Sequence, residues 1–171
     1  MKIHNFQNSL QASERGTLII IDYLKRQSHV KSVEDVQDAP EYQQQDIDLI
    51  VNYNNNNKQT IEVKIDSYYY KTQNLFWEEI SCIETNSIGC FMYSQANLFY
   101  YYFYPGDVLY NFNIHEARKW FIANKTRFKQ KYIKNKRYDG SLYTSVGRII
   151  PRNIFLNENS VTVTNQIENI F

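Results

Sequence analysis

The chain has 171 residues, a length at which a single domain with one core is the usual arrangement. Hydrophobic residues make up 43% of it and aromatic residues 16%, which excludes intrinsic disorder because disordered segments lack the apolar surface that offsets the entropy of ordering. The formal net charge is only +1, so the total charge by itself indicates no nucleic-acid or membrane partner.

The first predicted element is a helix over Leu10–Gln27. Polar cap residues precede it, and apolar residues such as Leu18 and Leu24 recur along it at helical spacing. Gly16 weakens the helix by about 1 kcal/mol relative to alanine, so we expect it to mark a close contact. A short strand is predicted to follow at Val30–Val36.

The next predicted unit is a β-hairpin. Ile47–Tyr53 and Thr60–Ile65 both alternate and are rich in residues that favour strands, and Asn54–Asn57 joins them in a sequence typical of a turn. A further strand is predicted at Asn74–Ile80.

A second hairpin and a helix are predicted in the middle of the chain. Leu98–Tyr104 and Val108–Phe112 flank Pro105-Gly106-Asp107, a turn signal between two aromatic runs. Asn113 resembles a helix N-cap, and the apolar residues after it predict a helix to about Lys131.

The last predicted strands are Leu142–Pro151 and Val161–Val163. A helix, several strands and a second helix in this order predict an α/β or α+β fold with a central mixed sheet flanked by helices. Without a repeat or a linker, we expect residues 1–171 to form one domain.

The charges are unevenly distributed along the chain. Glu34–Asp48 holds six acidic residues and no basic one, whereas residues 124–152 hold nine Lys or Arg and one acid. Interleaved with Phe128 and Tyr132, the basic segment predicts contacts with phosphates and bases; the alternative is a solvated helix end. The predicted nucleic-acid-binding residues are Lys125, Arg127, Lys129, Lys131, Lys134, Lys136 and Arg137.

Two other classes of protein are excluded. The longest aliphatic run near the start, Leu18–Ile21, is far shorter than the roughly 20 residues of a membrane span or the 7 to 15 of a signal-peptide core, so we expect a cytoplasmic protein without a membrane partner. Cys82 and Cys90 lack the neighbouring histidines or cysteines of a disulfide scaffold or zinc motif, and we expect two buried thiols.

The first hairpin sorts its charged residues onto one face. Because side chains alternate along a strand, Asp48 shares a face with Ile50, while Glu62 and Lys64 share a face of the returning strand. A register that keeps the apolar faces together therefore brings Asp48 next to Glu62 or Lys64.

Two carboxylates this close repel each other unless a cation neutralises them. Mg²⁺ prefers oxygen ligands, so Asp48, Glu62 and the Val63 carbonyl are predicted to bind it, with Mn²⁺ as a substitute. Lys64 is predicted to orient or deprotonate an attacking water, or to neutralise charge on phosphorus. The alternative is a solvated face with an ion pair worth about 0 to 1 kcal/mol.

The pattern "DIDLIV" followed one hairpin later by "IEVK" resembles the active-site motif of the PD-(D/E)XK nuclease superfamily. The stretches "SERGTLIIIDYLKRQ", "NLFWEEIS" and "VGRIIP" extend the resemblance, to small phage and bacterial proteins of this type, over about half of the chain. Pro40 is not adjacent to Asp48, so the literal Pro-Asp pair is absent. This departure leaves either Asp46 or Asp48 as the ligand, and we prefer Asp48.

The resemblance implies a restriction-endonuclease-like fold and a Mg²⁺-dependent DNA endonuclease with Asp48, Glu62 and Lys64 as catalytic residues. It adds Glu14 on the preceding helix as a further catalytic residue; Glu78 or Glu79 could supply another polar group, since alternation lets only one of them face the site. A homodimer or higher oligomer is expected, because cutting two strands needs two active sites. The other possible functions are a catalytically inactive nucleic-acid-binding protein and a protein-interaction domain with an aromatic surface.

Overall fold

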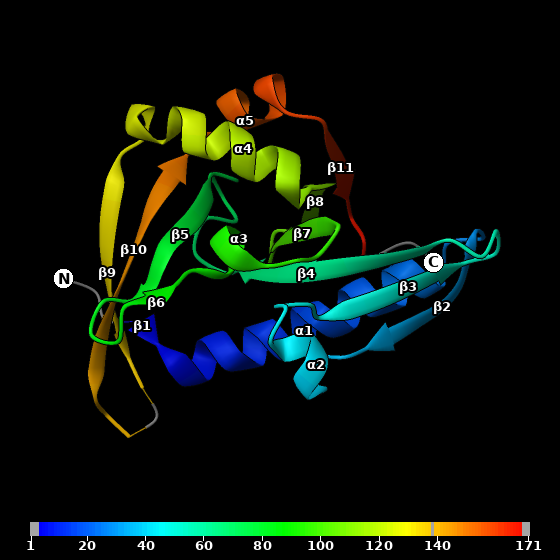
Figure 1. Cartoon of the computed structure of the whole chain (residues 1–171), viewed down its shortest axis with the longest axis horizontal. Coiled ribbons are helices and arrows are strands. Elements are labelled where there is room, and N and C mark those ends of the chain that lie inside the picture. The colour runs from blue at the N-terminus through cyan, green and yellow to red at the C-terminus, as the bar shows by residue number, and fades with distance from the viewer. Residues whose placement is uncertain (1–3, 138, 169–171) are drawn as a thin grey trace.

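The computed structural model describes residues 4–137 and 139–168, which form two β-sheets packed with helices (Figure 1). The larger sheet has the strand order β11-β8-β7-β4-β3-β2, and it is mixed because β4 and β7 are parallel while the other neighbours are antiparallel. Its strands are β2 (Val30–Asp35), β3 (Leu49–Tyr53), β4 (Lys58–Asp66), β7 (Leu98–Phe103), β8 (Val108–Asn113) and β11 (Val161–Asn165).

The smaller sheet has the order β1-β9-β10-β5-β6 and runs across one end of β4 (Figure 1). The two-residue strand β1 is parallel to β9, and the other neighbours are antiparallel. Its strands are β1 (His4–Asn5), β5 (Leu75–Cys82), β6 (Ser87–Ile88), β9 (Gln130–Lys136) and β10 (Leu142–Ile150).

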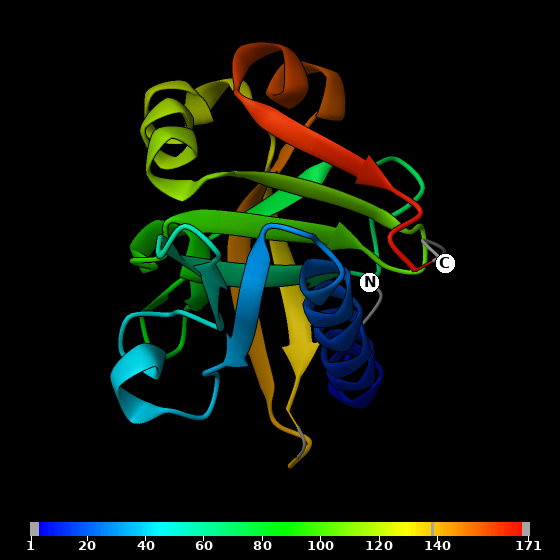
Figure 2. The same ribbon diagram turned by 90° about the vertical axis from the view of Figure 1, so that its right-hand side faces the viewer.

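The helices cover both faces of the larger sheet. Figure 2 shows α1 on one side of it and α4 with α5 on the other. The helices are α1 (Phe6–Lys25), α2 (Pro40–Gln43), α3 (Cys90–Tyr93), α4 (Ile114–Asn124) and α5 (Arg152–Glu158). Two sheets with helices on their faces confirm the predicted α+β class. In the part of the chain described, no helix is long and apolar enough to cross a membrane.

The central strand β7 is buried on both faces, which explains its unbroken aromatic run. Phe99, Tyr101 and Phe103 point into a core shared with the smaller sheet and with α4 and α5. Tyr100 and Tyr102 point into a second core under α1. The larger sheet therefore separates two hydrophobic cores, and its edge near the smaller sheet is where polar groups can gather.

Most of the predicted elements are present with shifted ends. The first predicted helix is α1, which begins at Phe6, and both predicted hairpins form. The side chain of Asn113 caps α4 by accepting a hydrogen bond of 3.0 Å from the Glu116 N–H, as its position predicted. The close contact expected at Gly16 is confirmed, since a β-carbon there would lie 2.7 Å from the Ile65 side chain.

The prediction of a helix to about Lys131 was wrong. Helix α4 ends at Asn124, a 3-10 turn covers Lys125–Arg127, and the chain then extends into β9. Phe128 at this corner is buried in the core beneath α4. Burial of this ring, together with pairing along the whole of β9, outweighs helix propensity, and residues 130–136 of the basic segment therefore lie on a strand.

The register of the first hairpin is one of those that the sequence allowed, because it keeps the apolar faces together. Leu49 pairs with Ile61, and the Asp48 N–H donates to the Ile61 carbonyl at 3.0 Å, so Asp48 lies opposite Glu62. Leu49 and Ile61 are buried in the core under α1, and Glu62 points to the opposite face. The fold thereby places acidic residues where the two sheets approach each other.

Candidate metal centre

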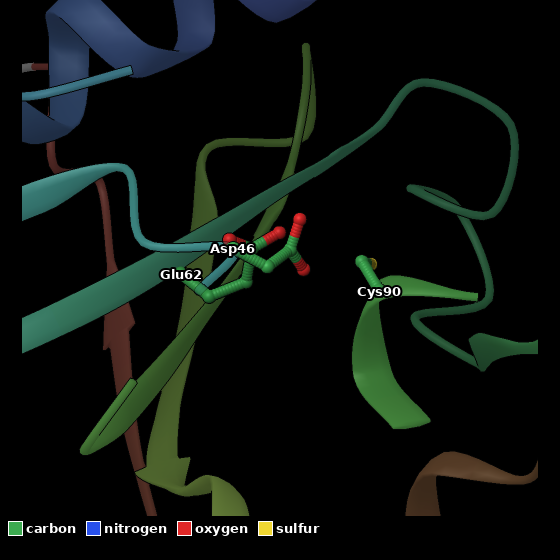
Figure 3. A group of neighbouring side chains, drawn as sticks. All are labelled: Asp46, Glu62 and Cys90. Carbon is green, nitrogen blue, oxygen red and sulfur yellow. The ribbon is translucent and has the colours of Figure 1, made fainter. Parts of the chain in front are cut away.

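Three carboxyl groups meet at the start of β3 and on β4. Asp46 and Asp48 flank Ile47, which is buried, and Glu62 is only 5% exposed. Figure 3 shows the Asp46 and Glu62 side chains reaching into the same space, with the Cys90 side chain of α3 opposite them. One carboxylate oxygen of Asp46, one of Glu62 and the Cys90 sulfur all lie within 4.8 Å of one another.

Asp46 is held in place by the end of α3. Its backbone is in the left-handed region with φ 53°, and its carbonyl accepts a hydrogen bond of 2.7 Å from the Ser94 hydroxyl. Its Oδ1 accepts a bond of 3.0 Å from the Tyr93 hydroxyl. Its Oδ2 is buried and has no hydrogen-bond partner among the described residues. Asp46 is therefore held in one position, with its Oδ2 free of hydrogen bonds to the described residues.

Asp48 and Glu62 form a carboxyl pair. Asp48 accepts a bond of 2.8 Å from the Val63 N–H, and the two carboxyl groups are hydrogen bonded to each other. Oε2 of Glu62 is buried and, like Oδ2 of Asp46, finds no partner in the part of the chain described. The unpartnered oxygens thus belong to Asp46 and Glu62, while Asp48 is engaged by its neighbours.

Burial and mutual repulsion disfavour the charged forms of these acids. Burial raises the pKa of Asp48 to about 6. Burial, then the nearby Asp48 and Asp46 carboxylates, raise the pKa of Glu62 well above its usual range, and burial raises that of Asp46. Burial also raises the pKa of the Cys90 thiol. Such a group of acids binds either protons or a cation.

Lys64 lies two residues beyond Glu62 on the same face of β4. Its ammonium nitrogen is 3.9 Å from a carboxylate oxygen of Glu78 on β5. The Glu78 carboxylate raises the pKa of Lys64, so the side chain is a stable cation. Glu79 points to the other face, where it binds Lys125 at 2.8 Å and Arg148 at 2.9 Å. Of the two glutamates, only Glu78 faces the site, as alternation required.

Glu78 lines two cavities. One, of about 170 Å³, is lined by Lys64 and by residues of β9 and β10. The other, of about 670 Å³, is lined by Arg137 and Tyr143 in the β9–β10 hairpin.

Asp66, the next acid on β4, has a structural role. Its carboxylate accepts hydrogen bonds from the Tyr68 and Tyr69 N–H groups and from the Tyr101 hydroxyl.

The structure does not bring every predicted catalytic residue to this cluster. Glu14 is exposed on α1, which packs through Gly16 against Ile65 and thus on the face of β4 opposite to Glu62. Val63 supplies its N–H to Asp48, and the predicted role of its carbonyl as a ligand stays a prediction.

The predicted nucleic-acid-binding residues divide into three groups. Lys125 is paired with Glu79, and Arg127 forms a two-pronged ion pair with Glu158, so their charges are largely neutralised. Lys131 donates to the Tyr69 hydroxyl at 3.1 Å, and Arg137 stacks on Tyr143, both beside the cavities. The third group is exposed and comprises Lys129, Lys134 and Lys136.

Cys90 is the member of the cluster that sequence reasoning missed, and Asp46 is the ligand candidate that it ranked second. Cys90 is distant from both strands of the hairpin in sequence, and its expected role was that of a buried thiol; it is only partly buried, whereas Cys82 is buried. No spacing links it to Glu62. In the sequence, the signal for Asp46 was its position two residues before Asp48, at the end of the polar segment Gln43–Asp48. In the structure, the left-handed backbone of Asp46 sets the direction of its side chain.

The chain matches no protein-family model, no curated protein and no solved structure. The resemblance to the PD-(D/E)XK superfamily therefore depends on the sequence stretches quoted above alone.

The metal-free protein is expected to lose stability as the pH rises from about 4 to about 7. A carboxyl group whose pKa is higher in the folded than in the unfolded chain stabilises the fold fully below its unfolded pKa and loses this contribution as the pH rises through the folded pKa. For Asp48, with an ordinary pKa of 3.8 and a folded pKa of about 6, the loss is about 3 kcal/mol. Urea denaturation in the presence of a chelator measures it. Asp48→Asn should flatten the pH dependence; an unchanged slope would contradict the assignment.

Proposed function

We propose that the protein is a divalent-metal-dependent endonuclease that hydrolyses phosphodiester bonds in DNA. The observation that carries the proposal is the pair of buried, unpartnered oxygens of Asp46 and Glu62, which face the same space beside the ammonium group of Lys64. Unpartnered buried oxygens are costly unless a ligand satisfies them, so this donor set fits a hard or borderline cation.

When bound, the ion supplies polarisation of a phosphoryl oxygen and acidification of a coordinated water. The residues of the chain do the rest. Asp46 and Glu62 would hold the ion as carboxylates, so Asp48, anchored by the Val63 N–H, would have to carry the proton of the hydrogen bond through which it orients Glu62. Lys64, fixed as a cation by Glu78, neutralises negative charge that develops on the phosphate. Its raised pKa favours this role over deprotonation of the attacking water.

The surroundings support DNA as the substrate. Lys131 contacts the rings of Tyr68 and Tyr69, which line the smaller cavity, and Arg137 lines the larger cavity and stacks on Tyr143. Such tyrosine rings suit stacking with bases or packing against sugars. Lys129, Lys134 and Lys136 add exposed positive charge on the same segment. The DNA structures that the protein cuts would indicate its biological role, which could be restriction, homing, junction resolution, recombination or repair.

The test is cleavage of supercoiled plasmid, linear duplex, junction, flap and single-stranded DNA with Mg²⁺ or Mn²⁺. We expect cutting that a chelator stops and that Asp46→Asn reduces at least about tenfold, because even the loss of an outer partner of a metal ligand costs about 10- to 100-fold. Glu41→Gln, which removes an exposed acid on α2, is the matched control and should cut normally. Cutting that continues in the presence of a chelator would overturn the proposal.

Two outcomes would select the other functions. DNA retention without cation binding would indicate a nucleic-acid-binding protein with an inactive site. Failure to bind any nucleic acid even at low salt would indicate a protein-interaction domain, because phosphate contacts strengthen as salt is lowered. Sedimentation of the DNA complex tests the expected homodimer.

A further inference from the structure

The sulfur of Cys90 completes the ring of donor atoms around the space between Asp46 and Glu62. The three donor atoms lie within 4.8 Å of one another, and Figure 3 shows the Cys90 side chain directed toward the two carboxyl groups. Glu62, more than nine-tenths buried, aims an unpartnered oxygen into this space. A ligand that satisfies this oxygen would also lie beside the sulfur.

The backbone holds the sulfur in this position. Gly89, just before Cys90, approaches β5 so closely that a β-carbon there would lie 2.2 Å from the Glu78 carbonyl oxygen. The Ser94 N–H binds the Cys90 carbonyl at 2.9 Å, and Arg118 binds the Ser94 carbonyl at 2.6 Å. The turn that carries the thiol is therefore anchored at both ends.

The same turn also fixes Asp46, through the hydroxyl groups of Tyr93 and Ser94. One short segment thus sets the distance between the carboxylate and the sulfur. Cys82 is in a different setting, since its sulfur contacts Glu84 and Arg137 away from the carboxyl group cluster. The two cysteines can therefore be compared directly in one protein.

We infer that Cys90 is a thiolate ligand of the metal centre and that the centre prefers borderline transition-metal ions such as Co²⁺ and Zn²⁺ to Mg²⁺. Thiolates bind such ions strongly, whereas Mg²⁺ takes oxygen ligands almost exclusively. On binding, the Cys90 S–H bond breaks, its proton goes to water, and the sulfur forms a bond to the ion. This inference rests on the metal centre of the proposed function and does not depend on which bond the protein cleaves.

Titration of the metal-free protein with Co²⁺ under reducing conditions tests the inference without any activity assay. We expect a near-ultraviolet charge-transfer band from sulfur to cobalt in the wild-type protein and in Cys82→Ser, and its loss in Cys90→Ser. Loss of a direct ligand should weaken Co²⁺ and Zn²⁺ binding by at least the roughly 10- to 100-fold that loss of an outer partner costs. Mg²⁺ binding should be nearly unchanged in Cys90→Ser.

The possible failures are distinguishable. If Co²⁺ binds in a manner that needs Glu62 but produces no sulfur band, the inference about Cys90 is wrong and the proposed function stands. If no divalent ion binds the folded protein, both are wrong. Urea denaturation of the metal-free variants confirms that each is folded, and Cys90→Ala provides a second loss of sulfur if serine coordinates the ion through its hydroxyl.

Discussion

Glu62→Gln is expected to abolish metal-dependent cleavage and, in the same molecule, to make the metal-free protein more stable at neutral pH. A bound metal ion supplies several kcal/mol of transition-state stabilisation, and each 1.36 kcal/mol is a factor of ten in rate, so the loss should be about a thousandfold or more. Glu62 provides an unpartnered buried oxygen between two other acids, and a neutral amide cannot replace its charge.

The gain in stability has the same origin. Burial and the carboxylates of Asp48 and Asp46 raise the pKa of Glu62, so keeping this carboxyl group ionised at pH 8 destabilises the folded chain. Glutamine avoids this cost, and its amide can donate to Asp48. We therefore expect Glu62→Gln to raise the free energy of unfolding at pH 8 without metal.

Urea denaturation with a chelator, alongside plasmid cleavage with Mn²⁺, measures both effects. Glu41→Gln removes an exposed acid. It should change the free energy of unfolding by no more than about 0.5 kcal/mol and leave the cleavage rate as in the wild type. A Glu62→Gln protein that is less stable than the wild type would mean that Glu62 is a structural hydrogen-bonding residue. One that is more stable but cuts normally would remove Glu62 from the metal centre.

The part of the site that lies on the hairpin was predictable because it depends only on strand alternation and register. Leu49 and Ile61 had to share the buried face, which brought Asp48 next to Glu62 or Lys64 on the other side; the structure pairs it with Glu62. The same reasoning predicted that only one of Glu78 and Glu79 faces the site, since two adjacent residues of β5 point to opposite sides of the strand.

The remainder could not be derived from local patterns. Asp46 lies outside β3, and its direction is set by a left-handed backbone and by two hydroxyl groups from α3. Cys90 reaches the cluster because Gly89 packs against the backbone of β5, a tertiary contact without a periodic signal. The start of the basic segment, to about Lys131, was assigned to a helix because its charges hide the alternation that β9 shows once it is paired with β10.

Lys64→Ala is expected to lower the cleavage rate about 10²- to 10³-fold, the usual cost of removing a group that stabilises developing charge. Metal affinity should not fall, because the substitution removes a positive charge close to the ion without removing a ligand. This combination separates Lys64 from Glu62, whose replacement should abolish metal binding and cleavage together. Lys58→Ala, on the same strand but exposed, is the matched control and should behave as the wild type.

The pH profile then distinguishes the two roles that Lys64 could have. Glu78 lies 3.9 Å from the ammonium nitrogen and raises its pKa, so Lys64 stays charged well above neutral pH. If Lys64 acts as a cation, Lys64→Arg retains much of the rate and the wild-type rate shows no increase as Lys64 begins to lose its proton. If it acts as a base, the arginine variant is as slow as the alanine variant and the rate keeps rising with pH. A positive side chain beside two unpartnered carboxylate oxygens favours the cation role. A pH profile typical of a base would therefore require the ion pair between Lys64 and Glu78 to be broken during catalysis.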